Sequence, residues 1–257
     1  MKNATQPKSG VELLDAHTII ERIERWIRVQ FNGEYVADTK NAYLMRRGAG
    51  QLAYYFPEAD VKMKHLVPRR DDQQDRKYFD VRVKDQVAKG AAWKLSNPLD
   101  EESVLKDYFA FHWNRMDHWF EEEEEVIGHP RDPYHRVDIR ASSRSVRVEL
   151  NGTILADSIR STVVFETGLP ARFYLPREDV DMDKLETSSV KTICPYKGQA
   201  SYWSALVEGE RFMNLAWCYE VPLPEMSRIA GLLSFFNEKV DLFVDSELQE
   251  RPITPWS

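Results

Sequence analysis

The segment from Thr192 to Gly198, Thr-Ile-Cys-Pro-Tyr-Lys-Gly, holds the residues of this sequence with the clearest chemical potential. Pro195 fixes one backbone angle and Gly198 permits a turn that most residues resist, so one tight loop can present both Cys194 and Lys197. A nearby ammonium group stabilises a thiolate, which makes a cysteine more reactive at neutral pH. We therefore interpret Cys194 and Lys197 as candidate catalytic residues, a nucleophile and a stabiliser of negative charge. A buried, inert cysteine near a surface lysine is the alternative.

Two strand-like runs after this loop carry aromatic side chains in alternation. In the run 201–207, Tyr202 lies on one face, and in the run 212–219, Trp217 and Tyr219 share a face. If the two strands pair, an aromatic-lined pocket with phenol donors forms beside the loop that carries the cysteine and the lysine. A packed aromatic core gives the same pattern, so both interpretations stay open.

Charged side chains also gather in the segment 129–136, His-Pro-Arg-Asp-Pro-Tyr-His-Arg. His129 and His135 are six residues apart, which does not fit the i, i+4 spacing of helical metal ligands, and we predict no metal site. Arg131 is instead a candidate for reaching a phosphate or carboxylate of a ligand. The sequence has no phosphate-binding loop, dinucleotide glycine motif or Gly-x-Ser-x-Gly elbow, and we predict no cofactor.

The elements that must position these residues are repeated along the chain. A shift of 119 residues superimposes identical residues over a long stretch, and a shift of 124 does so farther on, so the second copy holds five more residues (124 − 119). The extra residues fall on the segment with Cys194 and Lys197, which the first copy replaces by Arg69–Arg76. The matched pairs include Arg28 with Arg147, Asn32 with Asn151, Gly33 with Gly152, Tyr55 with Tyr174, Pro57 with Pro176, Met63 with Met182, Trp93 with Trp217, and Pro98 with Pro222.

Two more charged residues are specific to the second copy. The segment 165–172 corresponds to 46–53 in the first copy, so Glu166 and Arg172 have no counterpart of the same type. Glu166 could act as a general base or as an ion-pair partner of Lys197. A surface hairpin with exposed charges is the alternative.

Each copy has the pattern of a β-rich domain. Apolar residues alternate in the runs 27–31 and 146–150, and each run ends at Asn-Gly, a strong hairpin signal. Helical patterns follow Pro98 and Pro224, and the segment Leu13 to Arg25 could form a short helix. We predict a mainly β protein, a tandem repeat of two β-tent or barrel-like domains, each with a C-terminal helix.

The predicted organisation has five parts. They are an N-terminal extension (1–24), a first β-rich repeat with a degenerate site (25–120), an acidic run and proline-stiffened connector (121–142), a second β-rich repeat with the candidate site (143–247), and a C-terminal tail (248–257). We interpret Glu121 to Glu125 as a solvated run because five adjacent carboxylates repel one another.

Bulk properties narrow the class of protein. The 257 residues carry a net charge of −7, which argues against a nucleic-acid-binding protein held by a basic surface. No apolar run is long enough to span a membrane, and the N-terminus lacks the apolar core of a secretory signal. The two cysteines, Cys194 and Cys218, are too few for a disulfide framework, so we expect a cytoplasmic protein. The oligomeric state is not predicted.

Several strings of the second copy resemble the domain-of-unknown-function 427 family. They are FETGLPARFYLPREDV, CPYKGQASYW, NLAWCYEVPLPE and IAGLLSFFNEKVD, and the string HPRDPYHRVDIR resembles members with two such domains in tandem. The resemblance implies a β-tent-like domain, and the family has also been labelled nucleotidyltransferase-like. The positions that it marks are Tyr174, Cys194, Lys197, Tyr202, Trp217 and Tyr219.

We expect the second domain to bind a small polar molecule, anionic or nucleotide-like, with or without catalysis. Its ligand-binding residues would be Glu166, Arg172, Tyr174, Tyr202, Trp217, Tyr219 and Arg131, around Cys194 and Lys197. The alternative is a non-catalytic protein-interaction module, in which the acidic run and the aromatic faces contact a partner protein.

Overall fold

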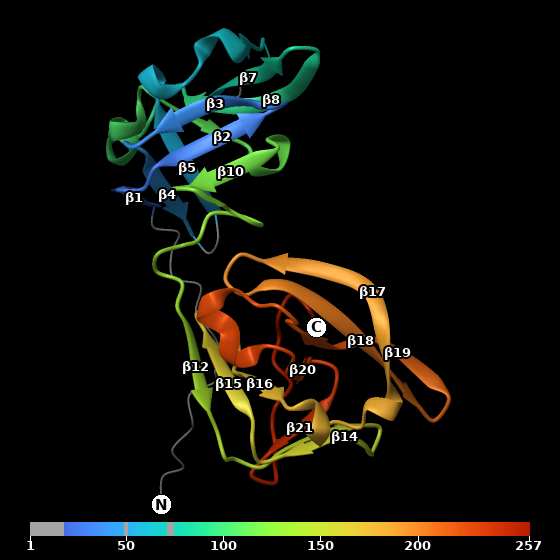
Figure 1. Cartoon of the computed structure of the whole chain (residues 1–257). Helices are drawn as coiled ribbons and strands as arrows, with labels where there is room; N and C mark the ends of the chain where they lie inside the picture. Colours follow the sequence, from blue (N-terminus) through green and yellow to red (C-terminus); the bar gives the residue numbers. More distant parts are fainter. Residues whose placement is uncertain (1–17, 49–50, 71–74) are drawn as a thin grey trace, which may run out of the picture. The chain divides into compact units, whose positions relative to one another are not determined.

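The computed structural model describes residues 18–257 except 49–50 and 71–74, and the chain divides into two compact units, residues 1–132 and 133–257 (Figure 1). Each unit contains one seven-stranded and one four-stranded antiparallel sheet. The protein is therefore mainly β, as the alternation of apolar residues predicts.

In the first unit, the larger sheet has the order β1-β4-β5-β9-β8-β7-β6 and the smaller one β11-β10-β2-β3. The strands are β1 (Thr18–Arg22), β2 (Ile27–Phe31), β3 (Glu34–Thr39), β4 (Tyr43–Arg47), β5 (Gln51–Pro57), β6 (Leu66–Pro68), β7 (Arg76–Val83), β8 (Gln86–Leu95), β9 (Tyr108–Phe111), β10 (His118–Glu121) and β11 (Glu124–Glu125). Short 3-10 helices connect them: η1 (Glu58–Asp60), η2 (Met63–His65), η3 (Asp100–Leu105) and η4 (Trp113–Arg115).

The second unit repeats this topology, with orders β12-β15-β16-β20-β19-β18-β17 and β14-β13-β21-β22. Its strands are β12 (Val137–Ala141), β13 (Val146–Leu150), β14 (Thr153–Ser158), β15 (Thr162–Glu166), β16 (Arg172–Leu175), β17 (Leu185–Cys194), β18 (Gly198–Val207), β19 (Glu210–Cys218), β20 (Leu233–Phe235), β21 (Asp241–Val244) and β22 (Glu247–Leu248). The 3-10 helices are η5 (Arg177–Asp179), η6 (Met182–Lys184) and η7 (Pro224–Ile229).

Details of the backbone confirm the duplication. Asn32-Gly33 and Asn151-Gly152 both adopt positive φ at the β2–β3 and β13–β14 turns, as the predicted Asn-Gly hairpins require. The β2–β3 pair has a register shift after Val29, and the β13–β14 pair has one at the equivalent residue.

The larger sheet of the second unit has an apolar cluster on each face, and this separates its core from its candidate site. On β18 and β19, Ala205, Ala216 and Cys218 face the main core, which also contains residues of the smaller sheet such as Val146. Trp217 and Tyr219 face the other side and form a second cluster. The predicted alternation of faces is therefore confirmed.

The predicted C-terminal helices are wrong. The segment after Pro98 forms η3 and then β9, and the segment after Pro224 forms η7 and then β20. On β9, Phe109 faces the main core and Ala110 faces the opposite cluster, so a strand buried on both faces produced a continuous apolar run. Such a run has no period of two and resembles a helical stripe.

The N-terminal helix is also wrong where the structure describes it. Residues 18–22 form β1, which pairs with β4, and residues 13–17 lie outside the described part of the chain. The β-branched run Thr18-Ile19-Ile20 favours a strand. The sheet of the first unit therefore begins within the predicted extension.

The acidic run forms a hairpin of the first unit. Glu121 and Glu124 pair across β10 and β11, and Arg25 and Arg28 contact Glu121 and Glu123. Arginines of the same unit thus neutralise part of the carboxylate charge.

Candidate functional site

The Cys-Pro-Tyr-Lys-Gly segment is the turn of the β17–β18 hairpin. Cys194 pairs with Gly198 at its base, and the Lys197 amide donates to the Cys194 carbonyl at 3.3 Å. Gly198 has a φ of +104°, and the Leu223 amide donates to the Lys197 carbonyl at 3.0 Å. The turn is therefore fixed at its base and on its outer side, which sets the direction of the lysine side chain.

The Lys197 ammonium is buried in an ion pair with Glu166, the last residue of β15. Each of the two side chains is 8% exposed. The same ammonium lies 3.9 Å from the sulfur of Cys194, a residue that is partly exposed. The turn thus brings the predicted thiol and amine together, and Glu166 is the partner of Lys197 that the sequence suggested.

His135, which the sequence suggested only as a possible metal ligand, completes this group. The His135 Nε2 atom lies 2.9 Å from the second carboxylate oxygen of Glu166. The imidazole stacks on Tyr196 of the turn, with centroids 4.2 Å apart and planes 26° apart. The Arg136 amide donates to the Thr167 hydroxyl at 2.9 Å, which holds the segment against the end of β15. Glu166 therefore bridges a lysine and a histidine.

Four aromatic residues pack on the same face of the sheet. Tyr202 pairs with Trp217 across β18 and β19, which confirms that the two aromatic strands are neighbours. The Trp217 indole donates to the Tyr174 hydroxyl at 3.0 Å. Tyr219 is buried in the same cluster, and its hydroxyl has no hydrogen-bond partner among the described residues.

The buried tyrosines of this cluster are hydrogen-bond donors over the physiological pH range. Burial, followed by the negative charge that Tyr174 and Cys194 can carry, raises the pKa of Tyr219. Burial likewise raises the pKa of Tyr174 and outweighs the opposing hydrogen bond from Trp217. Both phenols therefore keep their protons near neutral pH.

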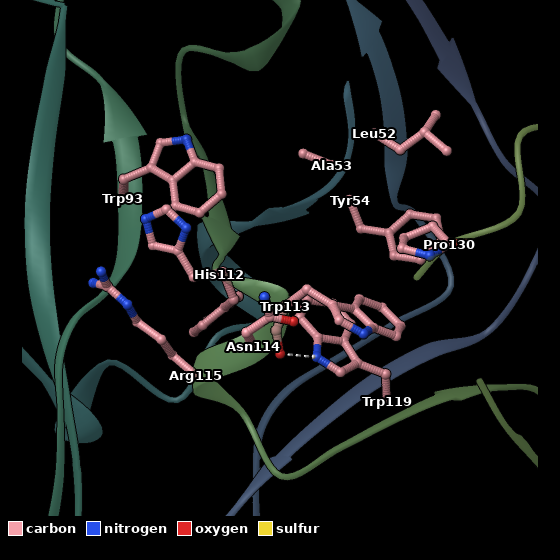
Figure 2. Close-up of a pocket in the computed structure, with 11 residues that line it drawn as sticks. Leu52, Ala53, Tyr54, Trp93, His112, Trp113, Asn114, Arg115, Trp119 and Pro130 are labelled. Atoms are coloured by element: carbon pink, nitrogen blue, oxygen red, sulfur yellow. Dashed lines mark hydrogen bonds between the residues drawn. The ribbon is translucent and has the colours of Figure 1, made fainter. Parts of the chain in front are cut away.

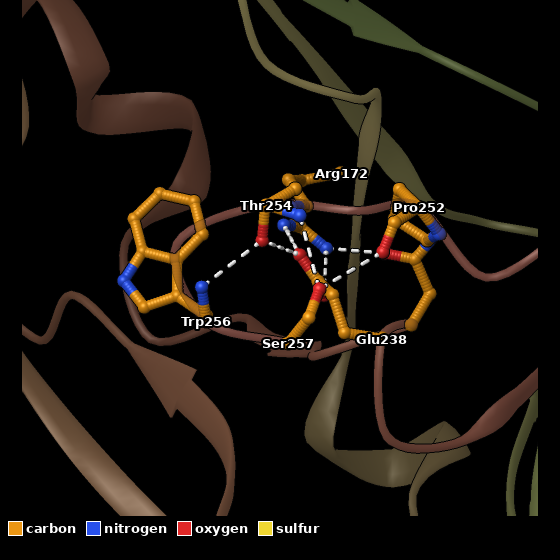
Figure 3. A network of polar contacts seen from close by, with 7 residues as sticks. Arg172, Glu238, Pro252, Thr254, Trp256 and Ser257 are labelled. Atoms are coloured by element: carbon orange, nitrogen blue, oxygen red, sulfur yellow. Dashed lines mark hydrogen bonds and ion pairs between the residues drawn. The ribbon is translucent and has the colours of Figure 1, made fainter.

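Arg172 does not join the Lys197 group. Its guanidinium forms a buried ion pair with Glu238 and also donates to Asn237, and the C-terminal tail lies against this network (Figure 3). The Thr254 hydroxyl donates to Glu238 at 2.6 Å. Arg172, which we predicted as a ligand-binding residue, thus links β16 to the C-terminal tail.

Arg131 belongs to the first unit, whereas the other predicted site residues belong to the second. Cys218 lies in the main core on the opposite face of the sheet, completely buried. Cys218 is therefore not part of the group around Lys197.

The first unit has a different ion pair at the equivalent place. Arg47 occupies the position of Glu166 and pairs with Glu102 of η3, whose side chain is 5% exposed. Tyr55 and Trp93 replace Tyr174 and Trp217 in the neighbouring aromatic cluster. An ion pair is therefore common to both copies, but the Arg47 side chain is 35% exposed, and the burial of both partners, the thiol and the histidine distinguish the second copy.

Two wider observations concern the described part of the chain. None of its helices is long and apolar enough to cross a membrane. Within it, no group of three or more histidine, cysteine and carboxylate side chains is arranged to hold a metal ion.

The fold and the site together define a class of duplicated antiparallel β proteins, in which the second copy carries a buried lysine–glutamate–histidine group beside a cysteine. The chain belongs to the family described as "Domain of unknown function (DUF427)", whose model matches residues 19–122 and 138–246. One match falls on each unit, and this confirms the resemblance seen in the sequence strings. A comparison with curated proteins found no match.

Proposed function

We propose that the second unit binds a small polar ligand at the group formed by Lys197, Glu166 and His135, next to the Cys194 thiol. The observation that carries this proposal is the burial of the Lys197–Glu166 pair, with both side chains 8% exposed, together with the second contact from His135 to the same carboxylate. Buried ion pairs contribute little net stability, because desolvation offsets their attraction. Linked titratable groups in buried positions are instead frequent at functional sites.

The donors of the site favour an anionic ligand. The Lys197 ammonium and the protonated hydroxyl of Tyr219 can both donate to a carboxylate or phosphate oxygen. Glu166 can accept a proton from the ligand or from His135, since each of its oxygens already contacts one basic group. The site can therefore bind a small anion and exchange a proton with it.

In a catalytic version of this proposal, Cys194 acts as a nucleophile. The residue is partly exposed, and its sulfur lies 3.9 Å from the ammonium of Lys197, which can stabilise negative charge on the sulfur or on the ligand. The buried aromatic side chains of Trp217 and Tyr174 limit access of water from the sheet side.

A binding screen tests this proposal. The full chain is mixed with a panel of small carboxylates, phosphates and nucleotides, and its melting temperature is measured. We expect at least one anion to raise the melting temperature, and we expect its affinity to fall at least about tenfold in Lys197→Met, which removes one charge-assisted contact. Arg47→Met is the matched control, because it removes the cation of the corresponding ion pair in the first unit and should leave binding unchanged.

A second variant guards against loss of folding. Lys197→Met leaves the Glu166 carboxylate without its ammonium partner, so Lys197→Met with Glu166→Met replaces the whole pair by apolar side chains of similar volume. Binding that survives in this folded double variant, or a panel without a single hit, would contradict the proposal. Retained binding with lost turnover in Cys194→Ser would support the catalytic version.

A further inference from the structure

The first unit contains a cavity of about 370 Å³ that the proposed function does not use (Figure 2). This volume falls within the range of about 300–1,000 Å³ that is typical of small-molecule sites. Its wall is mainly aromatic, with a few polar groups at one side. The lining residues include Tyr54, Trp93, His112, Trp113, Arg115 and Trp119.

The aromatic rings of this cavity are arranged in two pairs. Trp113 and Trp119 are stacked, with centroids 4.5 Å apart and planes 18° apart. Trp93 and His112 are also 4.5 Å apart, with planes 44° apart. Figure 2 shows the two pairs around the same space. Walls of this kind suit a flat ring, because aromatic stacking is gained over a large contact area.

The same place in the second unit is almost filled. The equivalent cavity there has a volume of about 10 Å³. Arg172 stands opposite Val164 in the β15–β16 pair, as Ala53 stands opposite Met45 in the β4–β5 pair, so Arg172 and Ala53 are equivalent. A shift of 124 residues relates Trp113 and Asn114 to Asn237 and Glu238.

In the second unit, side chains of the protein itself fill this space. The guanidinium of Arg172 fills the space and pairs with Glu238 (Figure 3). It lies 5.6 Å from the Trp217 ring centroid and 5.8 Å from that of Trp256, and the Trp256 ring also packs 6.2 Å from Phe236. A cation and an indole ring of the chain thus occupy the space that the first unit leaves open.

The segment that follows the last hairpin of each unit, β10–β11 or β21–β22, explains why this space is open only in the first unit. In both units it starts with the same contact, because the Val126 amide donates to Trp119 and the Gln249 amide donates to Leu242. In the second unit it continues to Trp256, whereas in the first unit it contributes Pro130 to the cavity wall. The first cavity therefore lacks both the guanidinium and the indole that close its counterpart.

The cavity of the first unit lacks the carboxylate that neutralises the arginine of its counterpart. Glu238 of the second unit is replaced by Asn114, and no carboxylate is among the lining residues, which include Arg115. One Arg115 nitrogen, Nη1, donates to the carbonyls of Lys89 and Gly90, and the other guanidinium nitrogens have no partner among the described residues. Burial and the charge of Arg115 and Arg76 lower the pKa of His112, which keeps this imidazole neutral.

We propose that the first unit binds a planar aromatic molecule that carries a negative charge. The ring inserts between the tryptophan pair and the Trp93–His112 pair, and the anionic group pairs with the remaining guanidinium nitrogens of Arg115. The first copy is then not a degenerate scaffold but a second binding module with a different ligand.

Isothermal titration calorimetry on the full chain tests this proposal with four probes. Indole-3-acetate and adenosine monophosphate carry a ring with a carboxylate or a phosphate, indole is neutral, and tryptamine is cationic. We expect saturable binding of one or both anions, at least about tenfold tighter than that of indole, in keeping with a hydrogen bond to a charged group. We expect tryptamine to bind most weakly.

Three variants locate the binding. Ala53→Arg with Asn114→Glu recreates the ion pair of the second unit in the cavity and should abolish binding, and Trp113→Ala should weaken it if the double variant does not fold. Arg115→Gln should remove the preference for anions and leave the affinity for indole unchanged. Lys197→Met, in the other unit, should have no effect, which separates this proposal from the one for the second unit.

Other outcomes overturn the proposal. Absence of saturable binding for both anions would exclude this ligand class. Anion binding that persists in the folded double variant would place the ligand elsewhere, and equal affinities for indole-3-acetate and tryptamine would show that Arg115 does not select the charge.

Discussion

The two cysteines are in contrasting surroundings. Cys194 is partly exposed in the β17–β18 turn, 3.9 Å from the Lys197 ammonium. Cys218 is completely buried in the core, and its thiol donates to Glu220 at 3.1 Å. Burial and this hydrogen bond raise the pKa of Cys218. The two thiols should therefore react at very different rates.

We predict that iodoacetamide modifies Cys194 at least about tenfold faster than Cys218 at neutral pH, since exposure and thiolate formation both control the reaction. Mass spectrometry of the peptides gives the two rates. The Cys194→Ser variant should retain only the slow reaction. Equal rates in the native chain would contradict the role assigned to the turn.

The buried carboxyl of Glu238 makes the free energy of unfolding depend on pH in the acidic range. Burial opposes its charged form, but hydrogen bonds from Arg172 and Thr254 outweigh this and hold the pKa of its carboxyl below its ordinary value. The folded chain thus binds a proton less readily than the unfolded chain. The resulting stability is fully present above the unfolded pKa of about 4.3 and is lost as the pH falls through the lower, folded value.

We predict that Glu238→Gln lowers the free energy of unfolding by about 3 kcal/mol near neutral pH, because it leaves Arg172 buried without a counter-ion. The loss should shrink as the pH falls below about 4. Urea unfolding of both proteins across this range measures the difference. Glu250→Gln, at an exposed carboxylate, is the control. A loss that does not change with pH would refute the ionised state of Glu238.

At the level of single residues, the sequence predicted part of the candidate site. The proline and glycine of the turn were sufficient to predict that Cys194 and Lys197 lie close together. Glu166 was identified as a candidate because the first copy has no glutamate at the equivalent position. His135 was considered only for metal binding, because its contact with Glu166 depends on β12 pairing with β15. Long-range pairing of this kind leaves no local signal in the sequence.

Among the elements, the β17–β18 hairpin depends most on one residue. Gly198 has a φ of +104°, and a Cβ atom added there would lie 3.4 Å from the Leu223 nitrogen and 3.5 Å from the Pro222 Cα. Both contacts are with backbone that also anchors the turn. An L-residue is therefore strained at this position by its φ, and its methyl group would lie in van der Waals contact with the anchoring segment.

We predict that Gly198→Ala lowers the free energy of unfolding by more than about 2 kcal/mol. Gly209 in the β18–β19 turn is a matched control, with a φ of +81° and no atom within 4 Å of the place that an alanine methyl group would take. Its change to alanine should cost about 1 kcal/mol, the cost of the left-handed conformation alone. Urea denaturation compares the two, and equal losses would exclude a contribution from the anchor.

Strands with one exposed face were easier to predict than strands buried on both faces. The alternating run of β13 and its Asn-Gly turn were recognised from the sequence, whereas β9 and β20 were predicted as helices. On β9 the side chains on both faces of the sheet are apolar, so the period of two disappears, and on β20 the polar Ser234 is itself completely buried. The second face is covered in part by η3 and η7, the 3-10 helices that immediately precede these strands in the chain.

For the whole molecule, the duplication was the most informative feature of the sequence. It predicted the number of domains and their β class, and the family match on both halves agrees with it. It also led to the view that the first copy had lost its site. That view considered only the positions of Cys194 and Lys197, whereas the cavity of the first unit lies at the place that Arg172 fills in the second.

The last strand of the larger sheet in the second unit has a consequence for handling the protein. β17 is an edge strand of ten residues, and its outward side chains include Val190 and Ile193, 40% and 54% exposed. An uncovered edge with apolar side chains is a template on which a strand of another molecule can add. The charges of Glu186 and Lys191 interrupt this edge, so concentrated solutions should stay free of aggregates only while these charges are unscreened.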